Sequence, residues 1–273
     1  MNPHLASIER GQGPSVVLLH GQPGTGASWD PVTELLAVDH HVLAPDRPGY
    51  GKTPGEARGL SDNADAIAAL IRLRCNAPVT VVAHSWSGGA AVLMADRHPE
   101  LVQSLVLVGA ACTPDSLNAL DRWLTVPALG DALTVLGLAG MGGLLPRVRP
   151  LTRFAPSRFR DRLEVALPDR GVAGSDRGAL GRHRRTFMIE QRSLVDELPT
   201  VATILGSLAV PVDVVSGEWD LVVPPRASAT LARAVPGATL TLIPRAGHFV
   251  ARDAPSSLVD AIRRCTGVEA RER

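Results

Sequence analysis

The sequence predicts an α/β fold, a mostly parallel sheet sandwiched by helices. Short apolar runs rich in β-branched residues alternate with helical patterns along the chain, and this order is typical of parallel strands joined by crossover helices. The runs are apolar throughout, as expected of strands that are covered on both faces. Six strands are expected, at 16–19, 41–44, 79–83, 105–108, 212–216 and 239–243.

Helices are expected between these strands. The patterns place them at 30–37, 61–74, 86–97, 226–234 and 254–265. Ser61 is expected to be the N-cap of the second helix, because a serine side chain can accept a hydrogen bond from a free N–H of the first turn. One further strand is expected near residues 5–9. Only about ten residues precede Gly11, so the sheet is expected to lack its first edge strand, and a second subunit of a homodimer could cover the exposed edge.

The alternation of strands and helices breaks once, between residues 113 and 198. This segment contains helical patterns cut by proline and glycine, so we expect a helical cap inserted between two strands of the C-terminal half. Residues 1–112 and 199–273 would then form the core, and residues 113–198 the cap.

The expected cap has two unlike halves. Residues 123–145 are almost wholly apolar, whereas residues 147–192 contain twelve arginines and five acidic residues. The simpler interpretation is a buried inner layer beneath a solvated basic layer. The alternative is a pocket for an apolar substrate beside a basic surface that attracts an anionic substrate or an acidic carrier protein.

Composition limits the classes of function. The chain has 273 residues, of which 45% are hydrophobic and 20% charged, so it can bury a sizeable core and is neither disordered nor fibrous. Its 28 basic and 27 acidic residues leave a net charge of +1, which provides no general field for nucleic acid or an anionic membrane. We therefore expect no nucleic-acid partner.

Location and redox chemistry follow from three further features. The apolar stretch 123–146 contains Pro127, Asp131 and five glycines, so no membrane span is expected. The three cysteines are far apart and lack CxxC spacing, which indicates neither a disulfide framework nor a zinc site. The N-terminus shows no signal-peptide pattern, and a cytoplasmic protein is expected.

The segment with the clearest chemistry is 79–91, which has the sequence VTVVAHSWSGGAA. An apolar strand leads directly to Ser85 and then to a helix that begins with small residues, as in a nucleophile elbow. The tight turn exposes the serine hydroxyl, and the helix N-terminus presents free N–H groups to a developing oxyanion. Ser87 also has small neighbours and is the alternative nucleophile, although it would already lie inside the helix.

Two further motifs, HGQPG at 20–24 and DRPGYG at 46–51, each follow an expected strand. With the elbow, they make the chain similar to the α/β-hydrolase superfamily, in the serine-hydrolase branch with an HGxP oxyanion loop and a GHSxGG-like elbow. Ala83 and Ser87 stand here where the strict elbow has glycines. The resemblance covers nearly the whole chain and implies an oxyanion hole made by the backbone N–H groups of Gln22 and Trp86.

The resemblance also implies a base and an acid. His248, in the segment IPRAGHFV at 243–250, follows the last expected strand and is the expected general base. Asp220, in GEWDLVVP at 217–224, is the expected acid, with Glu218 and Asp115 as alternatives. The chain order serine, aspartate, histidine is that of α/β-hydrolases.

Two other histidines lie beside the expected site. His20 and His84 are adjacent to turns that the fold requires, and one base is enough for the chemistry. We expect both histidines to organise loops rather than to move protons.

The expected function is hydrolysis of an ester or lactone of an apolar small molecule, through a Ser–His–Asp triad and an acyl-enzyme, with neither cofactor nor metal. The same triad could instead serve C–C bond hydrolysis, perhydrolysis, or a lyase or cyclase step. A third alternative is a ligand-binding protein that keeps the triad residues without turnover.

Overall fold

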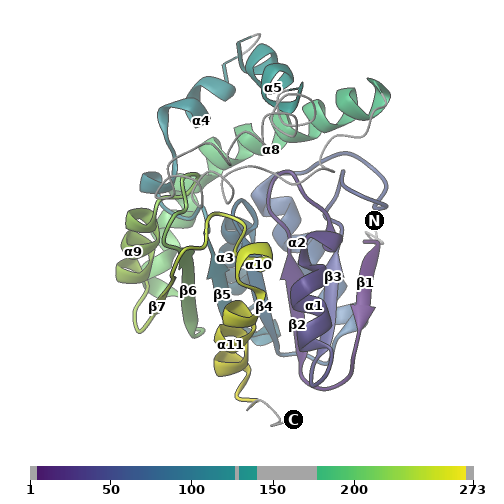
Figure 1. Ribbon diagram of the computed structural model, residues 1–273, viewed down its shortest axis with the longest axis vertical. Coiled ribbons are helices and arrows are strands. Elements are labelled where there is room, and N and C mark those ends of the chain that lie inside the picture. The colour runs from purple at the N-terminus through teal and green to yellow at the C-terminus, as the bar shows by residue number, and fades with distance from the viewer. Residues whose placement is uncertain (1–4, 127–128, 140–176, 269–273) are drawn as a thin grey trace, which may run out of the picture.

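The computed structural model describes residues 5–126, 129–139 and 177–268. Within these residues, one seven-stranded sheet has the order β1-β3-β2-β4-β5-β6-β7 (Figure 1). Neighbouring strands run parallel, except that β1 is antiparallel to β3. The strands are β1 (Ser7–Arg10), β2 (Ser15–Leu19), β3 (His41–Pro45), β4 (Val79–His84), β5 (Val102–Val108), β6 (Val212–Gly217) and β7 (Thr239–Ile243). This confirms the predicted α/β fold class.

Helices cover both faces of the sheet. Those of the core are α1 (Asp30–Leu36), α2 (Leu60–Arg74), α3 (Ser87–Arg97), α9 (Pro225–Ala234), α10 (Val250–Asp253) and α11 (Pro255–Thr266). Short 3₁₀ turns are η1 (Gly26–Trp29), η2 (Pro99–Leu101), η3 (Pro114–Ser116) and η6 (Leu205–Ser207). All five helices predicted from the sequence are present, with ends that differ by one residue.

The strands supply side chains to two separate hydrophobic layers. In β2, Val17 and Leu19 pack in the layer that contains α2 and α3, whereas Val16 and Leu18 pack in the layer that contains α1 and α11. All four are fully buried. Successive residues of a strand point to opposite faces, so a strand between two helical layers needs an unbroken apolar run, which is the pattern in the sequence.

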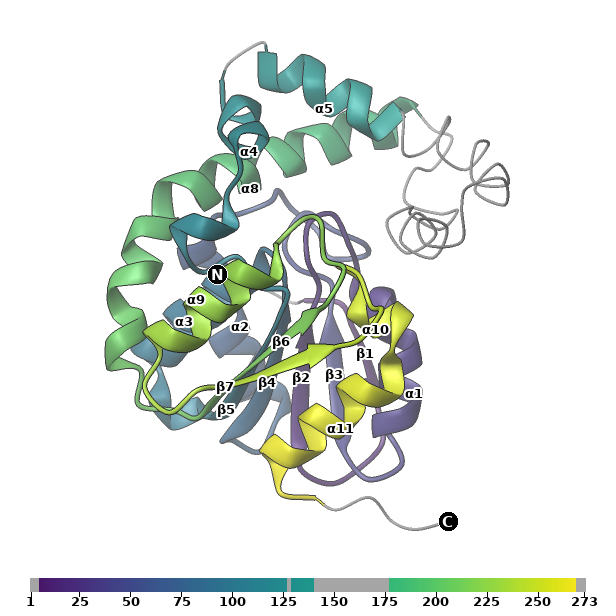
Figure 2. The same ribbon diagram turned by 60° about the vertical axis from the view of Figure 1, so that its left-hand side comes forward.

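Among the described residues, three more helices lie between β5 and β6, and we call them the cap helices. They are α4 (Ala119–Leu124), α5 (Leu129–Ala139) and α8 (Arg177–Ile204). Figures 1 and 2 show α4 and α5 above the carboxyl ends of the strands, while α8 runs from there down beside α3. Most of the basic half of the predicted cap lies outside the described residues. The predicted boundary between cap and core at 198/199 falls inside α8. The division of the chain into core and cap stays a prediction.

The apolar stretch 123–146 lies only partly within the described residues. No helix in the part of the chain that the structure describes has the length and apolar composition needed to cross a membrane.

The start of α2 differs from the prediction. The helix begins at Leu60 with Gly59 as its N-cap and has no side-chain cap of its own, so the expectation that Ser61 is the N-cap is wrong. Glu197 of α8 does this work instead, because its carboxylate accepts from the backbone N–H groups of Leu60 (3.0 Å) and Ser61 (2.9 Å). Ser193 accepts from the Leu60 N–H as well, at 2.8 Å.

This contact predicts the effect of removing the Glu197 carboxylate. In Glu197→Ala the Ser61 N–H loses its partner at the positive end of α2, and we expect the free energy of unfolding to fall by about 1 kcal/mol. Urea denaturation measures this loss. Asp196→Ala, which removes an exposed carboxylate one residue away on the same helix, is the control. An equal loss in both variants would contradict the capping role of Glu197.

Candidate active site

Ser85 occupies a sharp turn between β4 and α3. Its φ is +56°, a conformation that is uncommon for a residue other than glycine. The turn is held by the backbone: the Ser85 N–H donates to Val108 O at 3.0 Å, and Ser85 O accepts from the N–H groups of Gly88 (3.0 Å) and Ala111 (3.1 Å). These bonds keep the strained turn in place at the carboxyl end of β4.

Close packing explains the small residues around this turn. A Cβ atom at Gly88 would lie 2.5 Å from Ala110 Cβ, and one at Gly21 would lie 2.9 Å from Ser85 Cβ. Both distances are shorter than van der Waals contact allows, so a larger residue would push apart the chain segments that meet here. The loop that contains Gly21 therefore lies directly against Ser85.

The structure brings Ser85, His248 and Asp220 together. His248 Nε2 lies 3.0 Å from Ser85 Oγ, and His248 Nδ1 lies 2.8 Å from Asp220 Oδ2. The other carboxylate oxygen, Asp220 Oδ1, accepts from the backbone N–H groups of Val222 (2.8 Å) and Val223 (2.9 Å). All three side chains are buried, and their hydrogen bonds form one continuous chain from the hydroxyl to the carboxylate.

The alternative residues lie in other contacts. Ser87 is buried and donates to His20 O at 2.5 Å. Glu218 accepts from the Arg245 N–H at 3.2 Å, and Asp115 accepts from the Thr230 hydroxyl at 3.1 Å. The structure therefore does not bring Ser87, Glu218 or Asp115 to His248.

His20 and His84 make structural hydrogen bonds. His20 Nδ1 donates to Gly21 O at 2.9 Å, and its Nε2 accepts from the Arg47 N–H at 3.0 Å. His84 Nε2 donates to His248 O at 2.8 Å. Burial, together with the nearby charge of Arg47, holds the pKa of His20 well below its usual value, and burial lowers the pKa of His84 to about 3. Both imidazoles are therefore neutral near pH 7.

A buried ion pair lies behind the expected oxyanion residues, and sequence reasoning did not single it out. The guanidinium of Arg47, in the turn after β3, contacts the carboxylate of Glu190 on α8, and both side chains are fully buried. The Tyr50 hydroxyl donates to Glu190 Oε2 at 2.6 Å. Burial raises the pKa of Glu190, and the charge of Arg47 opposes this. The sequence did contain a sign that Glu190 is buried: it is an acidic residue next to apolar residues in an arginine-rich segment.

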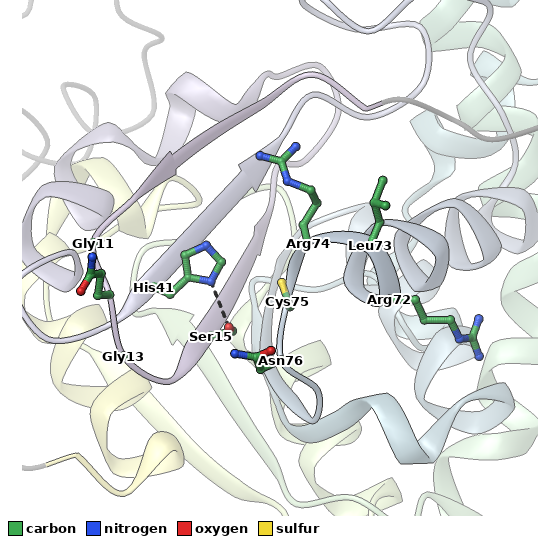
Figure 3. Close-up of a pocket in the computed structure, with 10 residues that line it drawn as sticks. Gly11, Gly13, Ser15, His41, Arg72, Leu73, Arg74, Cys75 and Asn76 are labelled. Atoms are coloured by element: carbon green, nitrogen blue, oxygen red, sulfur yellow. Dashed lines mark hydrogen bonds between the residues drawn. The ribbon is translucent and has the colours of Figure 1, made fainter.

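A separate polar hollow lies at the opposite end of the sheet (Figure 3). It has a volume of about 490 Å³ and is lined near the starts of β2 and β3, where Ser15 Oγ lies 3.0 Å from His41 Nδ1. Arg74, at its rim, is already paired with Glu9. Ser85 follows the carboxyl end of β4, so this hollow is not part of its surroundings.

Among the described residues, no group of three or more histidine, cysteine, aspartate or glutamate side chains is arranged to hold a metal ion.

Three features are typical of α/β-hydrolases: the sheet order, the turn at Ser85, and a histidine that is hydrogen-bonded to both a serine and an aspartate. The chain matches the model of the alpha/beta hydrolase family over residues 16–261, and it belongs to this family. This confirms the expected superfamily and the expected class of enzyme, a hydrolase.

Individual relatives and solved structures are similar to this chain over most of its length. The magnesium-chelatase 30 kDa subunit of Rhodobacter capsulatus is 32% identical over 251 residues, which cover 87% of this chain and 81% of the relative. The pimeloyl-[acyl-carrier protein] methyl ester esterase of Chromobacterium violaceum is 30% identical over 240 residues, 87% of this chain and 88% of the relative. A solved thermophilic esterase from Thermogutta terrifontis superposes with a TM-score of 0.72 over 96% of this chain and 93% of its own, at 21% identity, which shows the fold.

The lowered pKa of His84 predicts a pH dependence of stability. The unfolded chain protonates this imidazole near pH 6.5, whereas the folded protein does so only near pH 3. As the pH falls from 7 to 5, the unfolded state therefore gains a proton that the folded state cannot take, and His84 alone costs about 2 kcal/mol of stability.

His84→Gln tests this. Its side-chain amide can still donate to His248 O and does not titrate, so the loss of stability between pH 7 and 5 is expected to shrink by about 2 kcal/mol. Urea unfolding at both pH values measures the difference, and His98→Gln, outside the site, is the control. The same loss of stability in His84→Gln as in the unaltered protein would show that His84 is not held neutral.

Proposed function

We propose that this protein is a serine hydrolase that cleaves a carboxylic ester or lactone of an apolar small molecule. The observation that carries the proposal is the buried chain of hydrogen bonds from Ser85 through His248 to Asp220. A serine hydroxyl is a weak nucleophile alone, and a histidine within hydrogen-bond distance that is itself held by a carboxylate can activate it.

In the proposed first step, Ser85 Oγ attacks the carbonyl carbon of the ester while its proton passes to His248 Nε2. Asp220 accepts a hydrogen bond from His248 Nδ1, so it holds the tautomer that leaves Nε2 free to accept the proton. It also stabilises the imidazolium that forms. The N–H groups of Val222 and Val223 hold Asp220 in this orientation.

The attack creates a tetrahedral intermediate with a negative oxygen. We assign its stabilisation to the backbone N–H groups of Gln22, in the loop against Ser85, and of Trp86, the residue after the nucleophile. When the intermediate collapses, His248 gives its proton to the leaving alcohol and an acyl-Ser85 remains. Water then repeats the attack with His248 as base, releasing the carboxylic acid and restoring the serine.

An apolar substrate is supported by the side chains next to the triad in sequence. Leu221 and Val222, which follow Asp220, and Phe249, which follows His248, are large apolar residues with exposed fractions of 73%, 51% and 37%. Phe249 lies 5.5 Å from the His248 ring, centroid to centroid. The esterase from Chromobacterium violaceum among the relatives supports the choice of an ester bond. Since that esterase is named for a substrate on an acyl-carrier protein, an acyl group presented on an acidic carrier protein is the alternative form of the substrate.

Labelling with a fluorophosphonate tests the proposed chemistry, because phosphonylation requires an activated serine. We expect labelling on Ser85, found by peptide mapping, and its loss in Ser85→Ala and His248→Ala. With p-nitrophenyl esters of increasing acyl length as substrates, we expect kcat to fall by about 10⁴-fold or more in Ser85→Ala and by about 10⁴-fold in Asp220→Asn, in which the tautomer is no longer held.

Ser87→Ala and Asp115→Asn are the matched controls, because each removes an alternative residue without removing the hydrogen-bonded chain. Circular dichroism verifies that every variant is folded. Full ester turnover by Ser85→Ala would contradict the proposed nucleophile. Labelling of Ser85 without turnover of any ester, lactone or carrier-bound ester would contradict the proposed substrate class.

A further inference from the structure

The two expected oxyanion residues are held by a single turn of α8. Gln22 Nε2 donates to Phe187 O at 2.7 Å, and Trp86 Nε1 donates to Glu190 O at 2.9 Å. Phe187 and Glu190 are three residues apart, so their positions lie on the same face of the helix. The side chains of the two residues whose backbone N–H groups are the expected oxyanion donors therefore both bond to one cap helix.

Arg47 and His20 together determine the orientation of one of these donors. Arg47 Nη2 donates to Gly21 O and Arg47 Nε to His20 O, both at 3.0 Å, and His20 Nδ1 also donates to Gly21 O at 2.9 Å. The carbonyl of Gly21 and the N–H of Gln22 belong to the same planar peptide group and point in opposite directions. A donor fixed on the carbonyl therefore fixes the direction of the N–H, and a positive charge there also polarises the peptide and strengthens the N–H as a donor.

Glu190 in turn fixes Arg47. Its carboxylate contacts the guanidinium through both oxygens, while the Tyr50 hydroxyl donates to Oε2. The guanidinium also lies over the Trp86 ring, with Cζ 4.4 Å from the ring centroid. A fully buried charge is stable only with its partner, so Arg47 keeps this position only while α8 supplies Glu190.

The second donor is held differently. The peptide that carries the Trp86 N–H has Ser85 O as its carbonyl, which accepts from the backbone of Gly88 and Ala111 in the core. Its direction is set without α8. Only the Gln22 half of the oxyanion hole is therefore oriented by a side chain of the cap.

We propose that Glu190 is a positioning residue: through Arg47 it holds the Gly21–Gln22 peptide in the direction that the oxyanion needs, so that docking of α8 assembles half of the oxyanion hole. This inference rests on the proposed acyl chemistry, since the Gln22 N–H contributes to rate only where an oxyanion forms.

The test compares two glutamates on the same helix. In Glu190→Gln the charge that holds Arg47 is lost, and we expect kcat for a p-nitrophenyl ester to fall by about 10- to 100-fold while KM changes by less than about threefold. Affinity for a trifluoromethyl ketone is expected to fall by a similar factor, because its adduct with Ser85 carries an oxyanion. Glu197→Gln weakens another contact of α8 with the core, to α2, and is expected to keep kcat within about twofold.

A milder variant carries the test if Glu190→Gln does not fold. Gln22→Met keeps the backbone N–H and the side-chain length but removes the bond to Phe187 O. We expect kcat to fall by about 3- to 10-fold with KM little changed. The pH profile of kcat/KM is expected to stay as in the unaltered protein, because the base His248 is not affected.

Three results would overturn the inference: unchanged kcat in folded Glu190→Gln, or in Gln22→Met where Glu190→Gln does not fold; an effect confined to KM; or an equal fall in Glu197→Gln. Failure of the proposed function is separate, since it shows as absence of ester turnover by the unaltered protein. In that case hydrogen exchange decides the positioning role. Faster exchange of residues 20–24 in Glu190→Gln than in Glu197→Gln supports it, and equal exchange overturns it.

Discussion

The left-handed turn at Ser85 is the constraint on which the arrangement of the site depends. β4 lies between β2 and β5 in the sheet, so a residue at its carboxyl end is central to the loops that follow β2, β6 and β7. Because these strands are parallel, the loops that follow them all lie at the carboxyl ends of the strands. Gln22, Asp220 and His248 come from those three loops, and a positive φ at Ser85 is what turns its hydroxyl toward them.

The sequence predicted the parts of this arrangement that depend on local pattern. Strands covered on both faces must be continuous apolar runs, and their ends therefore showed where Ser85, Asp220 and His248 would lie. The N-cap of α2 could not be found in this way, because its acceptor, Glu197, lies 136 residues further along the chain than Ser61. Glu190 looked like a solvated residue of an arginine-rich segment, and its burial follows only from the packing of α8 on the turn at Arg47.

The ion pair of Arg47 and Glu190 has a use beyond stability. Taking two charges out of water costs free energy that their attraction rarely exceeds, and apolar residues of similar volume often serve a core equally well. An apolar pair could not direct two backbone carbonyls. The guanidinium presents its N–H groups in a rigid, planar fork, and here they reach His20 O, Gly21 O and the Glu190 carboxylate together. A lysine has no such fork and could not hold this geometry.

The helix α8 joins the cap to the core without a break. Leu194, Leu198 and Val201 pack in the layer with α2 and α3, and with Glu190 and Glu197 they follow the spacing of one helical face. Glu190 and Glu197 are seven residues apart, so the same face contacts the turn at Arg47 and the start of α2. A boundary at 198/199 falls inside this helix. Opening of the cap as a rigid body about that point would have to bend α8 or withdraw Glu190 from Arg47. Such an opening would therefore also change the direction of the Gln22 N–H, because the two are linked through the buried carboxylate of Glu190.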